Sequence, residues 1–251
     1  MRFKTAKGEI AVNVPDRTSL EAVVREKLQQ KQGFSLATLN LDHLVKMAKS
    51  AAYYKVYKAQ DFVVADGNPI VWMSRMAAMP VKLMPGSEMV IPLARWAAEE
   101  DRRVALFGSS EDALSAAADD LKKHVPNLEV SCIIAPPFGF DVNSDAASHY
   151  LQQIEASGAG LCFVALGAPK QETFALHGRE HAPSVGFASI GAGLDFLAGT
   201  QVRAPVWVQK IACEWLWRLM ESPARMWRRY LSCFAILPQH ILRSFALRWR
   251  A

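Results

Sequence analysis

A chain of 251 residues can bury a sizeable core, and 51% hydrophobic with 21% charged residues is the composition of a globular protein. No run approaches the roughly 18 apolar residues that a membrane span requires, and no apolar segment of a secretory signal follows the basic N-terminal residues. The net charge of +5 is uneven, and four scattered cysteines without metal-ligand spacing indicate free thiols in a cytoplasmic protein.

Apolar, β-rich runs alternate with helical patterns from about residue 34 to residue 193. The predicted strands are 35–39, 62–65, 104–107, 130–135, 161–166 and 186–190. Most are continuous apolar runs, as expected for a parallel sheet that is covered on both faces. We expect one more strand, Ile10–Val14, at an edge of this sheet.

Helical patterns with start signals lie between the strands. Three helices are predicted to begin after a capping side chain: 41–50 after Asn40, 88–100 after Ser87 and 111–124 after Ser110. The alternation predicts an α/β fold, with a Rossmann-like open, mostly parallel sheet and helices on both faces. We assign this core to residues 1–200.

Residues 201–251 form a different kind of segment. They hold nine basic and two acidic side chains, together with five of the seven tryptophans. Arginine on one face and aromatic or aliphatic side chains on the other are typical of a helix that lies in a bilayer interface. We therefore expect a basic, aromatic-rich helical appendage that contacts an anionic membrane surface. Nucleic acid is a weaker alternative, because no nucleic-acid-binding motif is present.

Small polar residues and glycines follow the predicted strands. Ligands of open α/β sheets bind at the carboxyl ends of the strands, so these segments should meet along one rim. They are 38–40, 65–68, 108–110, 136–139, 167–172 and 191–195. Their composition suits phosphate groups and sugar hydroxyls.

Seven motifs occur in a fixed order. They are Thr38-x-Asn40, Asp66-Gly67, Pro85-Gly86-Ser87, Leu166–Glu172, Gly191–Gly199, Arg203-Ala204-Pro205-x-Trp207 and Glu214–Leu219. With these motifs the sequence resembles the WecG/TagA/CpsF family of bacterial glycosyltransferases over about residues 35–230.

The resemblance implies an inverting transfer from a UDP-sugar to an undecaprenyl-diphosphate-linked saccharide, in the synthesis of cell-surface polysaccharide or teichoic acid. N-acetylmannosamine, N-acetylmannosaminuronic acid and glucose are the candidate sugars. The resemblance also implies a Rossmann-like fold, no catalytic metal and no cofactor. Such an enzyme would be peripheral on the inner face of the cytoplasmic membrane.

Asp66 is the candidate general base. An inverting transfer needs a group that takes the proton of the attacking hydroxyl, and a partly desolvated carboxylate at a strand end can do so. Asp-Gly is also a common turn dipeptide, so the residues alone also allow Asp66 to be an ordinary turn residue without a catalytic role. The resemblance implies that Asp66 is the base.

Further residues are expected to bind the substrates. By resemblance Thr38 and Asn40 line the sugar site, although Asn40 is also a helix cap. Gln171 offers an amide to hydroxyls and Lys170 a charge to a diphosphate, unless both belong to a solvated helix start. The other expected substrate-binding residues are Gly67, Gly108, Gly167, Gly191, Gly193 and Asp195.

The chain contains no Asp-x-Asp pair and no histidine cluster to hold a metal. Side chains or helix N-termini must then neutralise the leaving group. Arg218, Arg225 and Arg228 would lie on one face of a continuous helix, unless Pro223 breaks it. The resemblance implies that these arginines reach the active site. A solvated basic helix is the alternative.

One position departs from the family pattern. Leu83, with Lys82 beside it, stands where the family usually has arginine, which bears on donor or acceptor identity. Two other functions stay open: a nucleotide-binding Rossmann oxidoreductase and a non-catalytic, membrane-associated nucleotide-sugar-binding module. The oxidoreductase is disfavoured because Phe196 replaces the third glycine of a dinucleotide fingerprint. An open site of this kind also allows a homo-oligomer.

Overall fold

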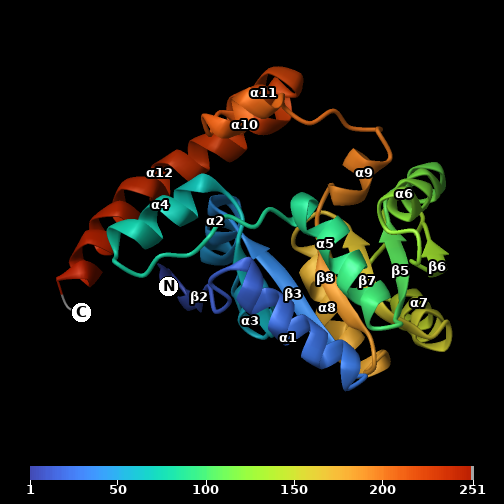
Figure 1. The fold of residues 1–251 in the computed structure, drawn as a ribbon. Helices are drawn as coiled ribbons and strands as arrows, with labels where there is room; N and C mark the ends of the chain where they lie inside the picture. Colours follow the sequence, from blue (N-terminus) through green and yellow to red (C-terminus); the bar gives the residue numbers. More distant parts are fainter. Residues whose placement is uncertain (250–251) are drawn as a thin grey trace.

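In the computed structural model, which describes residues 1–249, the core is a six-stranded parallel sheet (Figure 1). The strand order is β4-β3-β8-β7-β5-β6. The bounds are β3 Phe34–Leu39, β4 Phe62–Ala65, β5 Arg103–Gly108, β6 Val130–Ile134, β7 Ala159–Ala165 and β8 Gly186–Ser189. All six predicted strands are present. The Rossmann-like α/β architecture is thereby confirmed.

The additional edge strand was expected over Ile10–Val14, and this expectation is wrong. Residues Arg2–Thr5 (β1) and Gly8–Ala11 (β2) form a separate antiparallel hairpin. Because the chain folds back on itself here, the backbone groups of β2 are already paired with β1. Only Asn13 and Val14 reach the main sheet, where both form hydrogen bonds with the backbone of Val63 on β4.

Twelve helices are described within residues 1–249. They are α1 Arg17–Gln29, α2 Leu41–Lys49, α3 Ala51–Lys58, α4 Asn68–Met76, α5 Gly86–Glu99, α6 Glu111–His124, α7 Asp145–Ala156, α8 Lys170–His181, α9 Gly193–Leu197, α10 Val206–Lys210, α11 Glu214–Glu221 and α12 Pro223–Arg248. Asn40 and Ser110 cap α2 and α6 as expected, accepting from the backbone N–H of His43 and Ala113. Ser87 does not cap α5, because that helix begins at Gly86, two residues earlier than predicted, after Pro85.

Side chains alternate along the strands between two hydrophobic layers. On β5, Leu106 packs among side chains of α1, α5 and α6, whereas Phe107 faces α7 and α8. On β3, Leu39 packs against α2, α3, α4 and the β1–β2 hairpin. Helices therefore cover both faces of the sheet, which explains why its strands read as continuous apolar runs. The four cysteines are free thiols, as expected.

The chain beyond α9 forms three helices and crosses back over the carboxyl ends of the strands (Figure 1). Helix α12 packs against α2 and α4. It holds α11 through edge-on contacts of Trp215 with Tyr230 and Phe234. Of the two alternatives for this segment, a continuous helix and a break at Pro223, the break is present: α11 ends at Glu221 and Pro223 begins α12. The appendage thus brings two separate helices to the rim of the sheet.

Candidate functional site

A cavity of about 670 Å³ opens at the carboxyl ends of β3, β4, β7 and β8. The sheet and the first turns of the following helices form its floor, and α11 and α12 cover one side. Its polar lining residues are Thr38, Asn40, Asp42, His43, Lys46, Asp66, Asn68, Ser87, Gln171, Asp195, Gln201, Glu214, Arg218 and Arg229. This volume suits a ligand of the size of a nucleotide-sugar.

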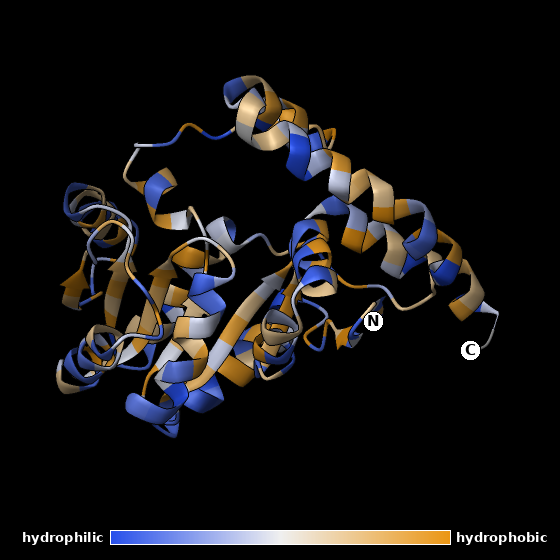
Figure 2. Cartoon of the chain, turned by 180° about the vertical axis from the view of Figure 1, so that it is seen from behind, coloured by the Kyte–Doolittle hydropathy of each residue, from blue (hydrophilic) through white to orange (hydrophobic). Residues whose placement is uncertain are grey.

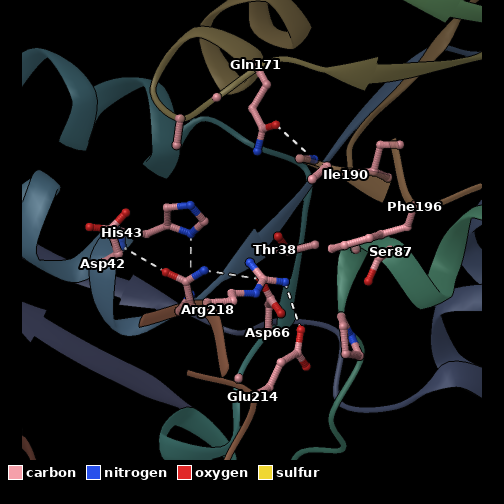
Figure 3. Close-up of a pocket in the computed structure, with 18 of the residues that line it drawn as sticks. Thr38, Asp42, His43, Asp66, Ser87, Gln171, Ile190, Phe196, Glu214 and Arg218 are labelled. Carbon is pink, nitrogen blue, oxygen red and sulfur yellow. Dashed lines mark hydrogen bonds and ion pairs between the residues drawn. The ribbon is translucent and has the colours of Figure 1, made fainter. Parts of the chain in front are cut away.

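Asp66 lies in the middle of the cavity (Figure 3). Its backbone N–H donates to the carbonyl of Leu39 at 2.8 Å, which fixes it at the end of β4. Its Oδ2 accepts a hydrogen bond from Nδ2 of Asn40 at 3.2 Å. Gly67 follows with φ +107°, a left-handed conformation that turns the chain from β4 into α4.

The surroundings of Asp66 adjust its acidity. Burial raises the pKa of its carboxyl group, while the Asn40 amide and the charge of Arg218 offset part of that rise. Asp66 is half-buried and lines the cavity. A carboxylate with a raised pKa at the centre of a cavity is a suitable proton acceptor.

A buried polar network runs from Asp66 through Asn40 and His43 toward Glu172 on α8. His43 is buried at the N-terminus of α2, where its Nδ1 accepts from the backbone N–H of Asn40 at 3.4 Å. Burial lowers the pKa of His43 to about 4, so its ring is neutral at physiological pH. Its Nε2 lies 4.0 Å from Oε1 of Glu172, whose pKa burial raises.

Gln171 is buried, and both ends of its amide are engaged. Nε2 donates to Glu172 at 2.8 Å, and Oε1 accepts the backbone N–H of Gly191 at 3.0 Å. The side chain therefore joins the start of α8 to the loop after β8. Gly191 and Gly167, on neighbouring strand ends, leave the cavity floor free of side chains.

Cationic side chains enter the cavity from the appendage. Arg218 on α11 pairs with Glu214 at 2.8 Å, and its guanidinium lies 5.7 Å from the ring centre of Phe196 (Figure 3). Arg229 on α12 lies 3.2 Å from Oδ2 of Asp42, which also pairs with Lys46 at 2.9 Å. Two cationic positions thus flank Asp66.

The opposite end of the cavity contains Asp195 on α9. Its carboxylate accepts hydrogen bonds from Ser109 and, at 3.1 Å, from Nε2 of Gln201. Ser87 and Phe196 line the same end. Hydroxyl, amide and carboxylate groups beside an aromatic ring offer contacts for a base or a ribose.

Residues 8–250 match the model of the glycosyl transferase WecG/TagA/CpsF family. The chain belongs to this family. It is a glycosyltransferase by this membership, and the resemblance in its motifs is confirmed.

The chain is similar to curated enzymes named N-acetylglucosaminyldiphosphoundecaprenol N-acetyl-beta-D-mannosaminyltransferase. It is 26% identical to that of Bacillus subtilis strain 168 over 234 residues, which cover 92% of this chain and 88% of the relative. Identity to that of Bacillus spizizenii is 28% over 207 residues, covering 82% and 77% of the two chains. For Staphylococcus aureus strain MW2 it is 25% over 234 residues, covering 90% and 89%.

Most of the expected site residues of this glycosyltransferase lie around the cavity. They are Thr38, Asn40, Asp66, Gly67, Gly167, Gln171, Gly191, Asp195 and Arg218. Their motifs are distant in sequence, and the parallel sheet brings them to one rim. Their roles in binding or catalysis remain predictions.

Four expected residues lie outside the cavity lining. Nζ of Lys170 donates to the carbonyl of Phe140 at 2.6 Å. A Cβ at Gly108 would meet the carbonyl oxygen of Ala165 at 2.5 Å, and one at Gly193 would meet Val90 at 2.9 Å, so these glycines serve close packing. Arg228 is exposed on α12 and absent from the lining. The side chain of Arg225 lies outside what the structure describes.

Four further residues line the cavity that the sequence motifs do not mark: Asp42, His43, Lys46 and Arg229. The first three follow the cap Asn40 on the first turns of α2, where they read as ordinary helix residues. Their position shortly after the end of β3 was the feature of the sequence that could have indicated a place in the site. Arg229 lines the cavity in place of Arg228, and it lies about three helical turns after Arg218, so helical spacing was the available signal.

Within residues 1–249, no group of three histidine, cysteine, aspartate or glutamate side chains is arranged to hold a metal ion. In the same part of the chain, no helix combines the length and the hydropathy that a bilayer crossing needs.

The appendage carries exposed apolar side chains. Hydrophobic and hydrophilic residues alternate along α12 (Figure 2). Its inner face buries Met226, Cys233 and His240, whereas its outer face leaves Trp227 57% and Leu242 71% exposed. The other exposed large apolar residues of the appendage include Val206, Trp207, Ile211, Met220, Leu231, Phe234, Phe245 and Trp249.

Proposed function

We propose that this glycosyltransferase moves N-acetylmannosamine, or a closely related hexose, from a UDP-sugar to an undecaprenyl-diphosphate-linked N-acetylglucosamine. The three relatives named above carry the acceptor and the sugar in their names, and the chain spans at least 77% of each of them. The observation that carries the proposal is Asp66, held by Asn40 at the centre of a cavity that cationic side chains border.

Asp66 acts as the general base in this proposal. Its carboxylate takes the proton of the attacking acceptor hydroxyl, whose oxygen bonds to the anomeric carbon while the bond from that carbon to the UDP oxygen breaks. Attack from the side opposite to the leaving group inverts the configuration. A raised pKa favours this role, because a base works best when its pKa approaches the operating pH.

The departing UDP takes up the electron pair of the broken bond, and its charge must be neutralised. Arg218 stands beside Asp66 and is held by Glu214 and by the ring of Phe196. A cation fixed before the reaction stabilises developing charge without reorganising. We therefore propose a metal-independent transfer. Gln171 orients the Gly191 loop, and Thr38 contacts the sugar.

The outer face of the appendage is the proposed membrane-binding surface. Exposed tryptophans beside arginines are typical of helices in a bilayer interface, and each basic side chain near an anionic surface adds on the order of 1 kcal/mol of attraction. Binding there would bring the cavity close to a lipid-linked acceptor on the inner leaflet.

A donor screen tests the proposed function. The full-length protein is incubated with UDP-N-acetylmannosamine, UDP-N-acetylmannosaminuronic acid, UDP-glucose or UDP-N-acetylglucosamine and a short-chain polyprenyl-diphosphate N-acetylglucosamine. Mass spectrometry should detect a disaccharide product with UDP-N-acetylmannosamine. Absence of a product with every donor would reject the proposal. A melting temperature raised by NAD and unchanged by UDP would favour an oxidoreductase instead.

A further inference from the structure

We propose that Lys46 on α2 and Arg229 on α12 form a second diphosphate-binding subsite, which holds the diphosphate of the acceptor. The inference rests on the proposed function and assigns the acceptor end of the cavity. It separates this end from the donor end, which contains Asp195 and Phe196.

The two cations converge on one carboxylate. Nζ of Lys46 lies 2.9 Å and Nη2 of Arg229 lies 3.2 Å from the same Oδ2 atom of Asp42. Asp42 is nearly buried, with 10% of its side chain exposed, so water screens its charge poorly. Two positive charges against one negative charge give the cluster of Asp42, Lys46 and Arg229 a local excess of positive charge. Such an excess attracts an anion.

Both cations retain capacity for a ligand. The Lys46 amine uses Asp42 and, at 3.0 Å, the carbonyl of Ala168, and about a third of the side chain remains exposed at the cavity. Nε of Arg229 is buried and has no hydrogen-bond partner among the described residues. An unpaired buried donor destabilises a fold, and a phosphate oxygen would satisfy it. The planar fork of arginine and the point charge of lysine are both common phosphate ligands.

The position of this pair matches the acceptor rather than the donor. In Figure 3, Asp66 lies between Asp42 on one side and Ser87 and Phe196 on the other. A base placed between two anion sites can take a proton from a ligand in one while the ligand in the other reacts. Arg229 also lies on the helix whose outer face exposes Trp227 and Leu231. A lipid chain attached to a diphosphate at Arg229 could therefore continue along α12.

Binding of inorganic pyrophosphate to the full-length protein tests the subsite. Titration calorimetry is performed with and without saturating UDP. Pyrophosphate should bind the UDP-saturated protein, and Lys46→Met should weaken this binding at least about tenfold, the usual loss of one charge-assisted contact. Lys49→Met is the matched control: it removes a lysine from the exposed side of α2, away from the cavity, and should bind normally.

Arg229→Met should weaken pyrophosphate binding in the same way. Arg229 also connects α12 to Asp42, so its replacement can weaken the packing of α12 against α2. If it does, Lys46→Met is the variant that decides the result. Loss of all pyrophosphate binding in the presence of UDP would overturn the second subsite. So would equal binding by wild type and Lys46→Met.

A second arm separates the acceptor from the donor. Lys46→Met should raise the KM for a short-chain polyprenyl-diphosphate N-acetylglucosamine about tenfold and leave UDP affinity unchanged. An unchanged acceptor KM, or a parallel loss of UDP affinity, would overturn the acceptor assignment. If wild-type protein binds pyrophosphate through Lys46 but fails to bind UDP, the proposed function fails and the anion subsite stands.

Discussion

Asn40 donates a hydrogen bond from Nδ2 to Oδ2 of Asp66 at 3.2 Å and so joins the ends of two neighbouring parallel strands. The Oδ1 atom of the same side chain accepts the backbone N–H of His43 and caps α2. One residue thus both begins a helix and orients the proposed base. Its two roles can be separated by mutation.

Asn40→Ser should lower turnover and leave stability nearly unchanged. Serine keeps a capping oxygen but lacks the amide that favours the ionised form of Asp66. Asn40→Ala loses both functions, so its free energy of unfolding should fall by about 1 kcal/mol below that of Asn40→Ser. Steady-state kinetics and urea denaturation measure the two effects. Wild-type turnover in Asn40→Ser would contradict the orienting role of the amide.

His43 should make the protein less stable as the pH falls from about 6.5 toward about 4. Its folded-state pKa is about 4, so within this window the unfolded chain binds the proton more readily. The free energy of unfolding should drop by up to about 3 kcal/mol from this residue.

Replacement by a neutral residue tests this origin of the pH dependence. His43→Gln should flatten the acid limb of the stability curve, measured by urea denaturation at several pH values. His149→Gln, on the exposed side of α7, controls for loss of a surface histidine. An unchanged slope in His43→Gln would show that other groups dominate acid unfolding.

Much of the fold is readable from the sequence because strands buried on both faces are continuous apolar runs. Phe62–Ala65 on β4 and Glu111–His124 on α6 have the expected bounds. The N-terminal hairpin was not predicted because the local sequence of a strand does not determine which strand it pairs with. Ile10 pairs with Phe3 nearby, and not with the main sheet.

The site was predictable where motifs follow strands and less so where helices contribute. Asp66 and Gln171 stand directly after strands or at the first turn of a helix. The place of Arg229 depends on how α12 packs against α2, and that of Lys170 on the carbonyl group of Phe140 near its amine. Such contacts involve distant segments, and periodicity carries no information about them.

Turnover should persist in excess EDTA. Arg218, Lys46 and Arg229 are the proposed counter-charges for the two diphosphates, so the transfer should need no divalent cation. The assay compares initial rates in EDTA with rates after addition of Mg²⁺ or Mn²⁺. Loss of activity on chelation, with recovery on adding either metal, would contradict the proposal that arginine and lysine side chains neutralise the two diphosphates.

The outer face of α12 should control membrane binding without affecting chemistry. Leu242→Ser, Phe245→Ser and Trp249→Ser together remove exposed apolar side chains and leave the inner face with Cys233 intact. The triple variant should turn over a water-soluble acceptor normally and bind anionic vesicles more weakly, with residual binding that is sensitive to salt. Vesicle flotation measures this. Equal flotation of wild type and variant would remove the interfacial role of this face.

The most direct test of the account compares turnover and UDP affinity in wild type and Asp66→Asn. Asparagine keeps the size of the side chain and removes the proton acceptor. Turnover should fall by roughly 10² to 10⁴, the usual contribution of a general base, with UDP affinity nearly unchanged. Near-normal turnover in Asp66→Asn would contradict the assignment of Asp66 as the base.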